Sequence, residues 1–105
     1  MDPTLIAWAA GLFEGEGCIT KRSGGYDQLK LSMTDFDVVR KFGSIVGVEQ
    51  YCNKKIYKAH HKPQLEWYCR KRSDIVRILT AFLPFFGNRR AYKALNILDD
   101  LELSI

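Results

Sequence analysis

The chain has 105 residues, of which 47% are apolar, and a formal net charge of +4. This length is enough for one hydrophobic core and too short for two, so we expect a single domain over residues 1–105. No run approaches the roughly 20 apolar residues that cross a bilayer, and no leader is evident, so we expect a soluble, intracellular protein without a membrane partner. The three cysteines are odd in number and lack CxxC spacing, which argues against a disulfide framework and a zinc site.

The first expected helix covers residues 3–15. Asp2 before Pro3 is typical of an N-cap followed by Pro at the first helical position. The last turn carries Glu14 and Glu16, although the dipole and unpaired carbonyls of a helix C-terminus disfavour each negative charge by a few tenths to about 1 kcal/mol. Oxygen atoms that converge there suit a hard divalent cation, which would relieve the repulsion. The alternative is that both acids are merely solvated.

Small residues form a stripe along the same helix. Gly11 and Gly15 stand four residues apart, and Ala7 and Ala10 extend the stripe. Glycine inside a helix costs about 1 kcal/mol relative to Ala. Two glycines in one turn therefore indicate that a second helix packs closely against this one, by the steric logic of small residues at helix contacts.

A first hairpin and a second helix follow. Residues 19–33 alternate apolar and polar around a Ser-Gly-Gly turn, which predicts two strands with one apolar and one polar face. Thr34 or Asp35 is expected to cap the next helix, which Gly47 closes.

The unit of a hairpin followed by a helix then occurs a second time. A second hairpin is expected with strands near 48–57 and 65–72, joined by a polar turn that contains two histidines. Ser73 is expected to cap a third helix that Pro84 limits, and Asn88 to begin a last one. The two hairpins can merge into one four-stranded antiparallel sheet whose inner face all the helices cover, so the fold class is α+β.

The other face of this sheet would be polar and open. Seven Lys or Arg lie between Lys54 and Arg72 against the single acid Glu66, with aromatic residues among them. Mixed donors, acceptors and charges are what base edges in the major groove require, whereas Lys and Arg alone would contact phosphates without sequence preference. Double-stranded DNA is therefore the expected partner, and an ordinary solvated sheet face is the alternative. The residues expected to contact DNA are Thr20, Arg22, Tyr26, Gln28, Lys30, Ser32, Lys54, Glu66, Tyr68, Arg70 and Arg72.

The register of the third strand stays open at this point. Cys52, Lys54 and Ile56 could face DNA, or Asn53 and Lys55 could do so instead, because the run has no clean alternation.

The segment Ala9–Gly17, AAGLFEGEG, resembles the signature of the LAGLIDADG homing endonucleases, with Ala for the first Leu, Phe for Ile and Glu for both Asp. The element order and the stretch Leu79–Phe86 also resemble a single-motif member, so the resemblance spans nearly the whole chain. It implies an αββαββα fold with a saddle-shaped sheet and a C-terminal helix. It also implies a homodimer in which the signature helices pack together and their acidic ends hold the metals that cleave both DNA strands.

The resemblance implies specific roles. Glu16 corresponds to the metal-binding acid, with the Gly17 carbonyl joining the metal shell. Asp35 stands where many members have a polar residue, often Gln, near the active-site water, and Arg89 stands where a Lys typically lies near the scissile phosphate. The residues implied at the dimer interface are Ala7, Gly11, Glu14 and Gly15.

The function expected from these residues is metal-dependent hydrolysis of phosphodiesters in a long, near-palindromic duplex. Mg2+ is the expected cofactor, with Mn2+ or Ca2+ as substitutes, and no small-molecule cofactor is expected. One alternative is a noncleaving DNA-binding protein or an RNA splicing maturase, since the family includes relatives of both sorts. Another is an interaction domain whose small-residue helix only dimerises.

Overall fold

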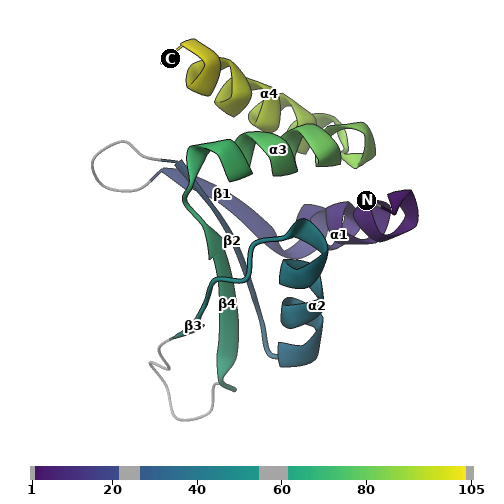
Figure 1. Cartoon of the computed structure of the whole chain (residues 1–105), viewed down its shortest axis with the longest axis vertical. Coiled ribbons are helices and arrows are strands. Elements are labelled where there is room, and N and C mark those ends of the chain that lie inside the picture. Colours follow the sequence, from purple (N-terminus) through teal and green to yellow (C-terminus); the bar gives the residue numbers. More distant parts are fainter. Residues whose placement is uncertain (1, 22–26, 55–61, 104–105) are drawn as a thin grey trace.

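A computed structural model describes residues 2–21, 27–54 and 62–103 of the chain (Figure 1). The elements follow the expected order of helix, two strands, helix, two strands and two helices. Their bounds are α1 Pro3–Glu16, β1 Gly17–Lys21, β2 Asp27–Met33, α2 Phe36–Val46, β3 Tyr51–Lys54, β4 Gln64–Cys69, α3 Arg72–Phe82, the short 3-10 helix η1 Leu83–Phe85, and α4 Asn88–Leu103. The α+β class is thereby confirmed. No helix among the described residues is long and apolar enough to span a bilayer.

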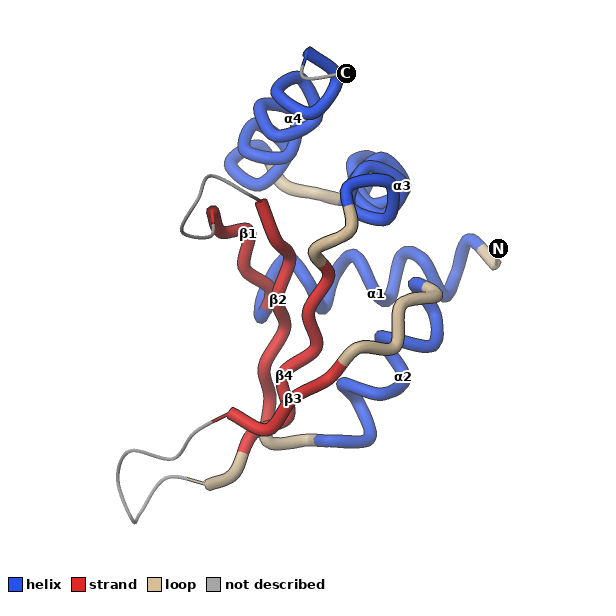
Figure 2. The backbone as a smooth tube through the Cα atoms, turned by 60° about the vertical axis from the view of Figure 1, so that its left-hand side comes forward, coloured by secondary structure: helices blue, strands red, loops and turns tan. Residues whose placement is uncertain are grey.

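The strands form one antiparallel sheet in the order β1-β2-β4-β3, so the two hairpins join through β2 and β4. Figures 1 and 2 show α1, α2 and α3 on the same side of this sheet. The expectation that every helix covers the sheet is wrong for α4, which packs on α3 as an outer layer. Ala94, Ile97 and Leu98 supply its buried side.

Local interactions account for several helix ends. Asp2 is the N-cap of α1, and its carboxylate accepts a hydrogen bond from the Thr4 amide at 2.8 Å, as the Asp-Pro pair predicted. Gly47 ends α2 with φ at 75°, a left-handed conformation that glycine adopts without penalty. Ser73 was expected to cap α3, but the helix begins at Arg72 with Lys71 as its N-cap and no side-chain capping bond.

The second hairpin is shorter than expected. Val48 was placed in a strand, yet its amide donates to the Gly43 carbonyl as the chain leaves α2, and its carbonyl accepts from the Trp67 indole at 2.7 Å. Both backbone groups of Val48 are therefore satisfied outside the sheet, and β3 begins only at Tyr51. At the other end β4 stops at Cys69, so Arg72 lies in a helix and not in the strand where it was expected.

An aromatic cluster fixes the helices against the sheet. Phe13, Phe42 and Phe82, one from each of α1, α2 and α3, are fully buried, with ring centroids 5.9–6.2 Å apart. Trp67 of β4 meets Phe42 edge-on at 4.7 Å. Such pairs contribute about 0.5–1.5 kcal/mol beyond the area they bury. Because Phe13 lies one turn from the end of α1, this cluster determines where the acidic turn of that helix lies.

Gly17 begins β1 directly after this turn. A Cβ atom added there would overlap the Phe13 ring, so the junction between α1 and β1 has no room for a side chain. The sequence implied a role only for the Gly17 carbonyl, as part of a metal shell. The structure shows a second role, because the absence of a side chain at Gly17 lets the backbone pass directly against the buried Phe13 ring.

Candidate active site and nucleic-acid interface

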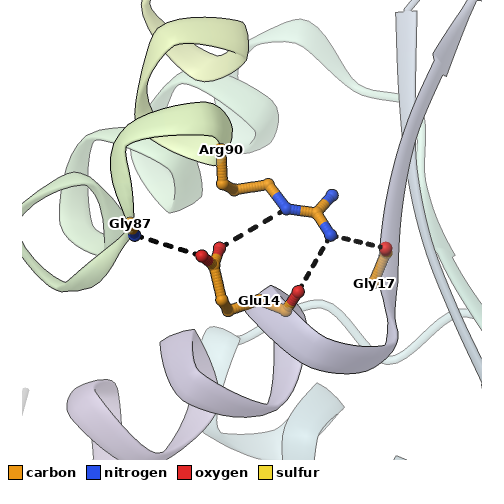
Figure 3. Close-up of polar contacts among 4 residues, drawn as sticks. All are labelled: Glu14, Gly17, Gly87 and Arg90. Carbon is orange, nitrogen blue, oxygen red and sulfur yellow. Dashed lines mark hydrogen bonds and ion pairs between the residues drawn. The ribbon is translucent and has the colours of Figure 1, made fainter.

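The two acids at the end of α1 have different surroundings. The Glu14 carboxylate is held by the start of α4: Oε1 accepts a hydrogen bond from the Gly87 amide at 3.1 Å, and Oε2 lies 3.5 Å from Arg90 Nε (Figure 3). The positive end of the α4 dipole and a guanidinium therefore both compensate the charge of Glu14.

Arg90 also donates hydrogen bonds to backbone carbonyls at the carboxyl end of α1. One of its terminal nitrogens donates to the carbonyl of Glu14 at 3.0 Å and to that of Gly17 at 3.1 Å, and its guanidinium lies 5.5 Å from the centroid of the Phe13 ring (Figure 3). Arg90 thus supplies positive charge beside Glu14 within the chain itself. The Gly17 carbonyl, expected in a metal shell, already accepts a hydrogen bond within the chain.

Glu16 differs from Glu14. Its side chain is exposed, and within the described part of the chain it has no hydrogen bond and no ion pair. Arg89 is likewise exposed and without such a partner among residues 2–21, 27–54 and 62–103. Because Arg90 and Glu14 join the two helix ends, the structure brings Arg89 and Glu16 to the same junction.

Asp35 stands apart from that junction. It is the N-cap of α2, exposed, with no side-chain capping bond. Among the described residues no hydrogen bond or ion pair connects Asp35 with Glu16 or Arg89, although the β1–β2 register places the end of β2 beside the start of β1.

The oxygen donors suit one kind of metal site. The described residues contain no cluster of three or more His, Cys, Asp or Glu side chains that could enclose an ion, so a closed cage formed by one copy does not fit. Mg2+ usually keeps several waters and binds through one or two carboxylates together with substrate phosphates. A single exposed Glu16 carboxylate per chain fits this second mode.

The outer face of α1 is open. Gly11 and Gly15 are exposed, and a Cβ atom added at either would meet nothing within 4 Å. Ala7, one turn before Gly11, is half-buried. The stripe of small residues is thus available to a partner. Glu14, which was grouped with it, turns toward α4 instead.

The strand register defines the polar face of the sheet. Thr20 pairs with Gln28, Lys30 with Tyr68, and Ser32 with Glu66, so these side chains share one face. The register also decides the open question in β3, because Cys52 and Lys54 stand opposite Glu66 and Gln64. Asn53, opposite the buried Leu65, faces the helices. The polar face comprises Cys18, Thr20, Gln28, Lys30, Ser32, Cys52, Lys54, Gln64, Glu66 and Tyr68, with Arg70 directly after β4.

Among the residues expected to contact DNA, Arg22 and Tyr26 lie outside the described residues, as do Lys55 and Ile56. Arg72, in α3, donates to the Leu101 carbonyl at 2.9 Å and so binds the last turns of α4.

Two networks organise the polar face. Arg70 Nε donates to the Gln28 side chain at 3.1 Å, and the guanidinium of Arg70 lies 4.6 Å from the ring centroid of Tyr68. Gln28 is only 6% exposed, so its side-chain amide is covered by neighbouring side chains and binds Arg70 within the sheet surface. In the second network the Glu66 carboxylate accepts hydrogen bonds from Ser32 and Cys52. Burial, followed by the hydrogen bond to Glu66, raises the pKa of the Cys52 thiol.

Arg90 is the residue of this site that the sequence reasoning missed, although a signal was present. A basic residue in the first turn of a helix is disfavoured by the dipole, just as an acid is in the last turn. Glu14 and Arg90 both break the rule and pair with each other. Two such exceptions in one chain indicate an ion pair between helix ends.

Solved structures of homing endonucleases have a similar fold. A crystal structure of the homing endonuclease I-CvuI in complex with its target, in the presence of calcium, covers 95% of this chain and 67% of its own, at 18% identity and a TM-score of 0.71. A second I-CvuI complex, with an I-CreI target and magnesium and with the DNA not cleaved, gives the same identity and TM-score over 95% and 68% of the two chains. The homing endonuclease I-TnaI covers 99% of this chain and 74% of its own, at 16% identity and a TM-score of 0.72. No protein-family model and no curated protein matches the sequence.

These solved structures are LAGLIDADG homing endonucleases, so the chain has the fold that its signature segment predicted.

Proposed function

We propose that this chain is a site-specific DNA endonuclease that acts as a homodimer through metal-dependent hydrolysis of phosphodiesters. The observation that carries the proposal is Glu16: a carboxylate without a partner among the described residues, at the end of a helix whose outer face is open. Its neighbour Glu14 is neutralised within the chain. The DNA complexes of I-CvuI, which has the same fold, support a duplex as the substrate.

Dimerisation would complete the site. Two copies of α1 that pack through Gly11 and Gly15 would bring two Glu16 carboxylates to one two-fold axis. The same symmetry presents an identical sheet face to each half of a near-palindromic duplex. The whole chain, residues 1–105, would act as one DNA-binding and cleaving domain.

Two residues at the junction and one at the start of α2 have proposed roles. Glu16 would hold the divalent cation, and Mg2+ fits this donor set; when bound, it activates water and stabilises charge on the phosphate. Arg89 would donate hydrogen bonds to the phosphate oxygens. Asp35, an exposed acceptor, would orient a water molecule from the start of α2.

Glu16→Gln is the variant that tests this function. We expect it to cleave a target duplex at least about 100-fold more slowly in Mg2+, since a catalytic metal contributes several kcal/mol to the transition state. DNA affinity should persist or rise, because a negative charge facing DNA is removed. Glu49→Gln, which removes an exposed acid from the loop before β3, is the control and should cleave normally. Equal rates for Glu16→Gln and the wild type would refute the proposal.

Binding and nicking assays on the wild-type chain distinguish an endonuclease from a noncleaving DNA-binding protein or a maturase. Tight duplex binding without nicking in Mg2+ or Mn2+ would identify a noncleaving DNA-binding protein. Preference for a structured RNA over every duplex would identify a maturase.

A further inference from the structure

Glu66 is the one acid among the basic and neutral side chains of the polar face defined above. It lies on β4, one of the two central strands, and is half-buried. Its direct neighbours across the sheet are Ser32 on β2 and Cys52 on β3. Lys30, Lys54 and Arg70 belong to the same face.

The Glu66 carboxylate is held in place by neutral donors on both sides. The Ser32 hydroxyl donates to Oε1 at 3.2 Å, and the Cys52 thiol donates to Oε2 at 3.5 Å. The raised pKa of Cys52 keeps that thiol protonated at neutral pH, so it remains a donor. An ionised carboxylate has about four acceptor sites, of which these bonds occupy two.

No described Lys or Arg nitrogen lies within ion-pair distance of Glu66. The carboxylate is therefore an oriented acceptor with unused capacity, and its full negative charge lies within a basic surface. Such a charge repels phosphates. On a surface that binds DNA, the carboxylate is unfavourable beside a phosphate and favourable where a hydrogen-bond donor of a base approaches it.

The major groove offers two such donors, the N4 amino group of cytosine and the N6 amino group of adenine. Adenine presents the N7 acceptor next to its amino group, which would repel a carboxylate. Cytosine has no acceptor on that edge, and acceptance from cytosine N4 is the usual contact of Glu and Asp. We propose that Glu66 selects cytosine at one position in each half of the target duplex. This inference depends on the proposed function, because it takes DNA as the ligand of the polar face.

The experiment uses a duplex that the wild-type chain selects from a random pool, together with its single-base-pair variants, and measures binding to each. We expect a symmetric pair of C·G positions at which replacement weakens wild-type binding about tenfold. Glu66→Gln should lose this preference, or exchange it for adenine, whose N6 and N7 suit the Gln amide. The preferences at all other positions should stay unchanged.

Matched variants separate base reading from charge. Glu49→Gln removes one exposed acid elsewhere and should keep the cytosine preference. Ser32→Ala removes one of the bonds that orient the carboxylate and should reduce the preference by a few-fold. Thermal unfolding of each variant verifies that it is folded.

The outcomes are distinct. A Glu66→Gln profile that matches the wild type at every position, with only a uniform change in affinity, would overturn the inference and leave the proposed function intact. Failure of the wild-type chain to bind any duplex would overturn the proposed function and this inference with it.

Discussion

At the scale of single residues, Glu14 and Arg90 each carry the charge that the end of its own helix disfavours. Each is placed to compensate the other, because the carboxyl end of α1 meets the amino end of α4. The guanidinium binds two carbonyls as well as the carboxylate, and the carboxylate accepts from the amide of Gly87, the residue directly before α4. One ion pair thus satisfies backbone groups at two helix ends.

Removing the Arg90 guanidinium should destabilise the protein. We expect Arg90→Gln to lower the free energy of unfolding by about 1–3 kcal/mol, since two carbonyls and a carboxylate lose a charged donor. Urea denaturation measures this change. Arg89→Gln is the matched control, because Arg89 is exposed in the same turn and should change stability by less than about 0.5 kcal/mol. Equal effects of the two substitutions would contradict the role given to Arg90.

The sequence predicted the roles of some of these residues and not of others. The Asp2 cap and the Gly47 terminator are local features, and both are confirmed. Arg90 is 76 residues from Glu14, and its contacts arise only from the packing of α4. Whether Glu16 binds metal stays a prediction.

At the scale of elements, α1 is apolar on more than one side. One side carries Phe13 into the core, while the opposite side presents Gly11 and Gly15, and Leu5 between these two sides keeps 41% of its surface exposed. A helix with a single buried face would place polar residues there. The glycine side is therefore suited to a second packing contact.

Gly11→Ala should affect the folded chain and the proposed dimer in opposite directions. The added methyl group meets nothing within 4 Å in one copy, so the chain should gain up to about 1 kcal/mol of helix stability. At a close helix contact the same methyl overpacks the interface by about 1–3 kcal/mol, which weakens dimerisation at least about fivefold. Thermal unfolding and analytical ultracentrifugation measure the two effects.

Ser44→Ala, at an exposed position of α2, controls for helix propensity and should leave association unchanged. If Gly11→Ala associates as tightly as the wild type, α1 does not form the interface through this face.

Alternation predicted the faces of β2 and β4 well. Leu29, Leu31, Leu65 and Trp67 are buried as expected. The limits of β3 could not be read from the sequence, because Val48 is held by contacts with α2 and with Trp67, which local pattern does not encode. The position of α4 on α3 was also unpredictable, since an amphipathic helix specifies a buried face but not its partner.

At the scale of the whole molecule, three helices cover one face of the sheet, and a basic, hydrogen-bonded surface remains on the other. The fold class was predictable because the order of elements and the signature segment agree. The sheet order β1-β2-β4-β3 was not, since two hairpins can join through different edges.

DNA binding by the polar face should depend steeply on salt. A chain that makes about six phosphate contacts should lose on the order of a thousandfold in affinity between 50 and 200 mM salt. Fluorescence anisotropy with a labelled duplex measures this loss. If Lys30 contacts a phosphate, Lys30→Gln should lower the slope of the log–log plot by about one and weaken all duplexes equally. An affinity that does not change with salt would exclude this surface as the DNA-binding site.

The contact between Glu14 and Arg90 also bears on biosynthesis. The signature segment is synthesised more than 70 residues ahead of Arg90, so both acids lack this guanidinium until the last part of the sequence has been made. Glu14 acquires its partner only when α4 packs against the end of α1. A product of premature termination before Gly87 would therefore retain the recognisable motif yet lack the arrangement that distinguishes its two carboxylates.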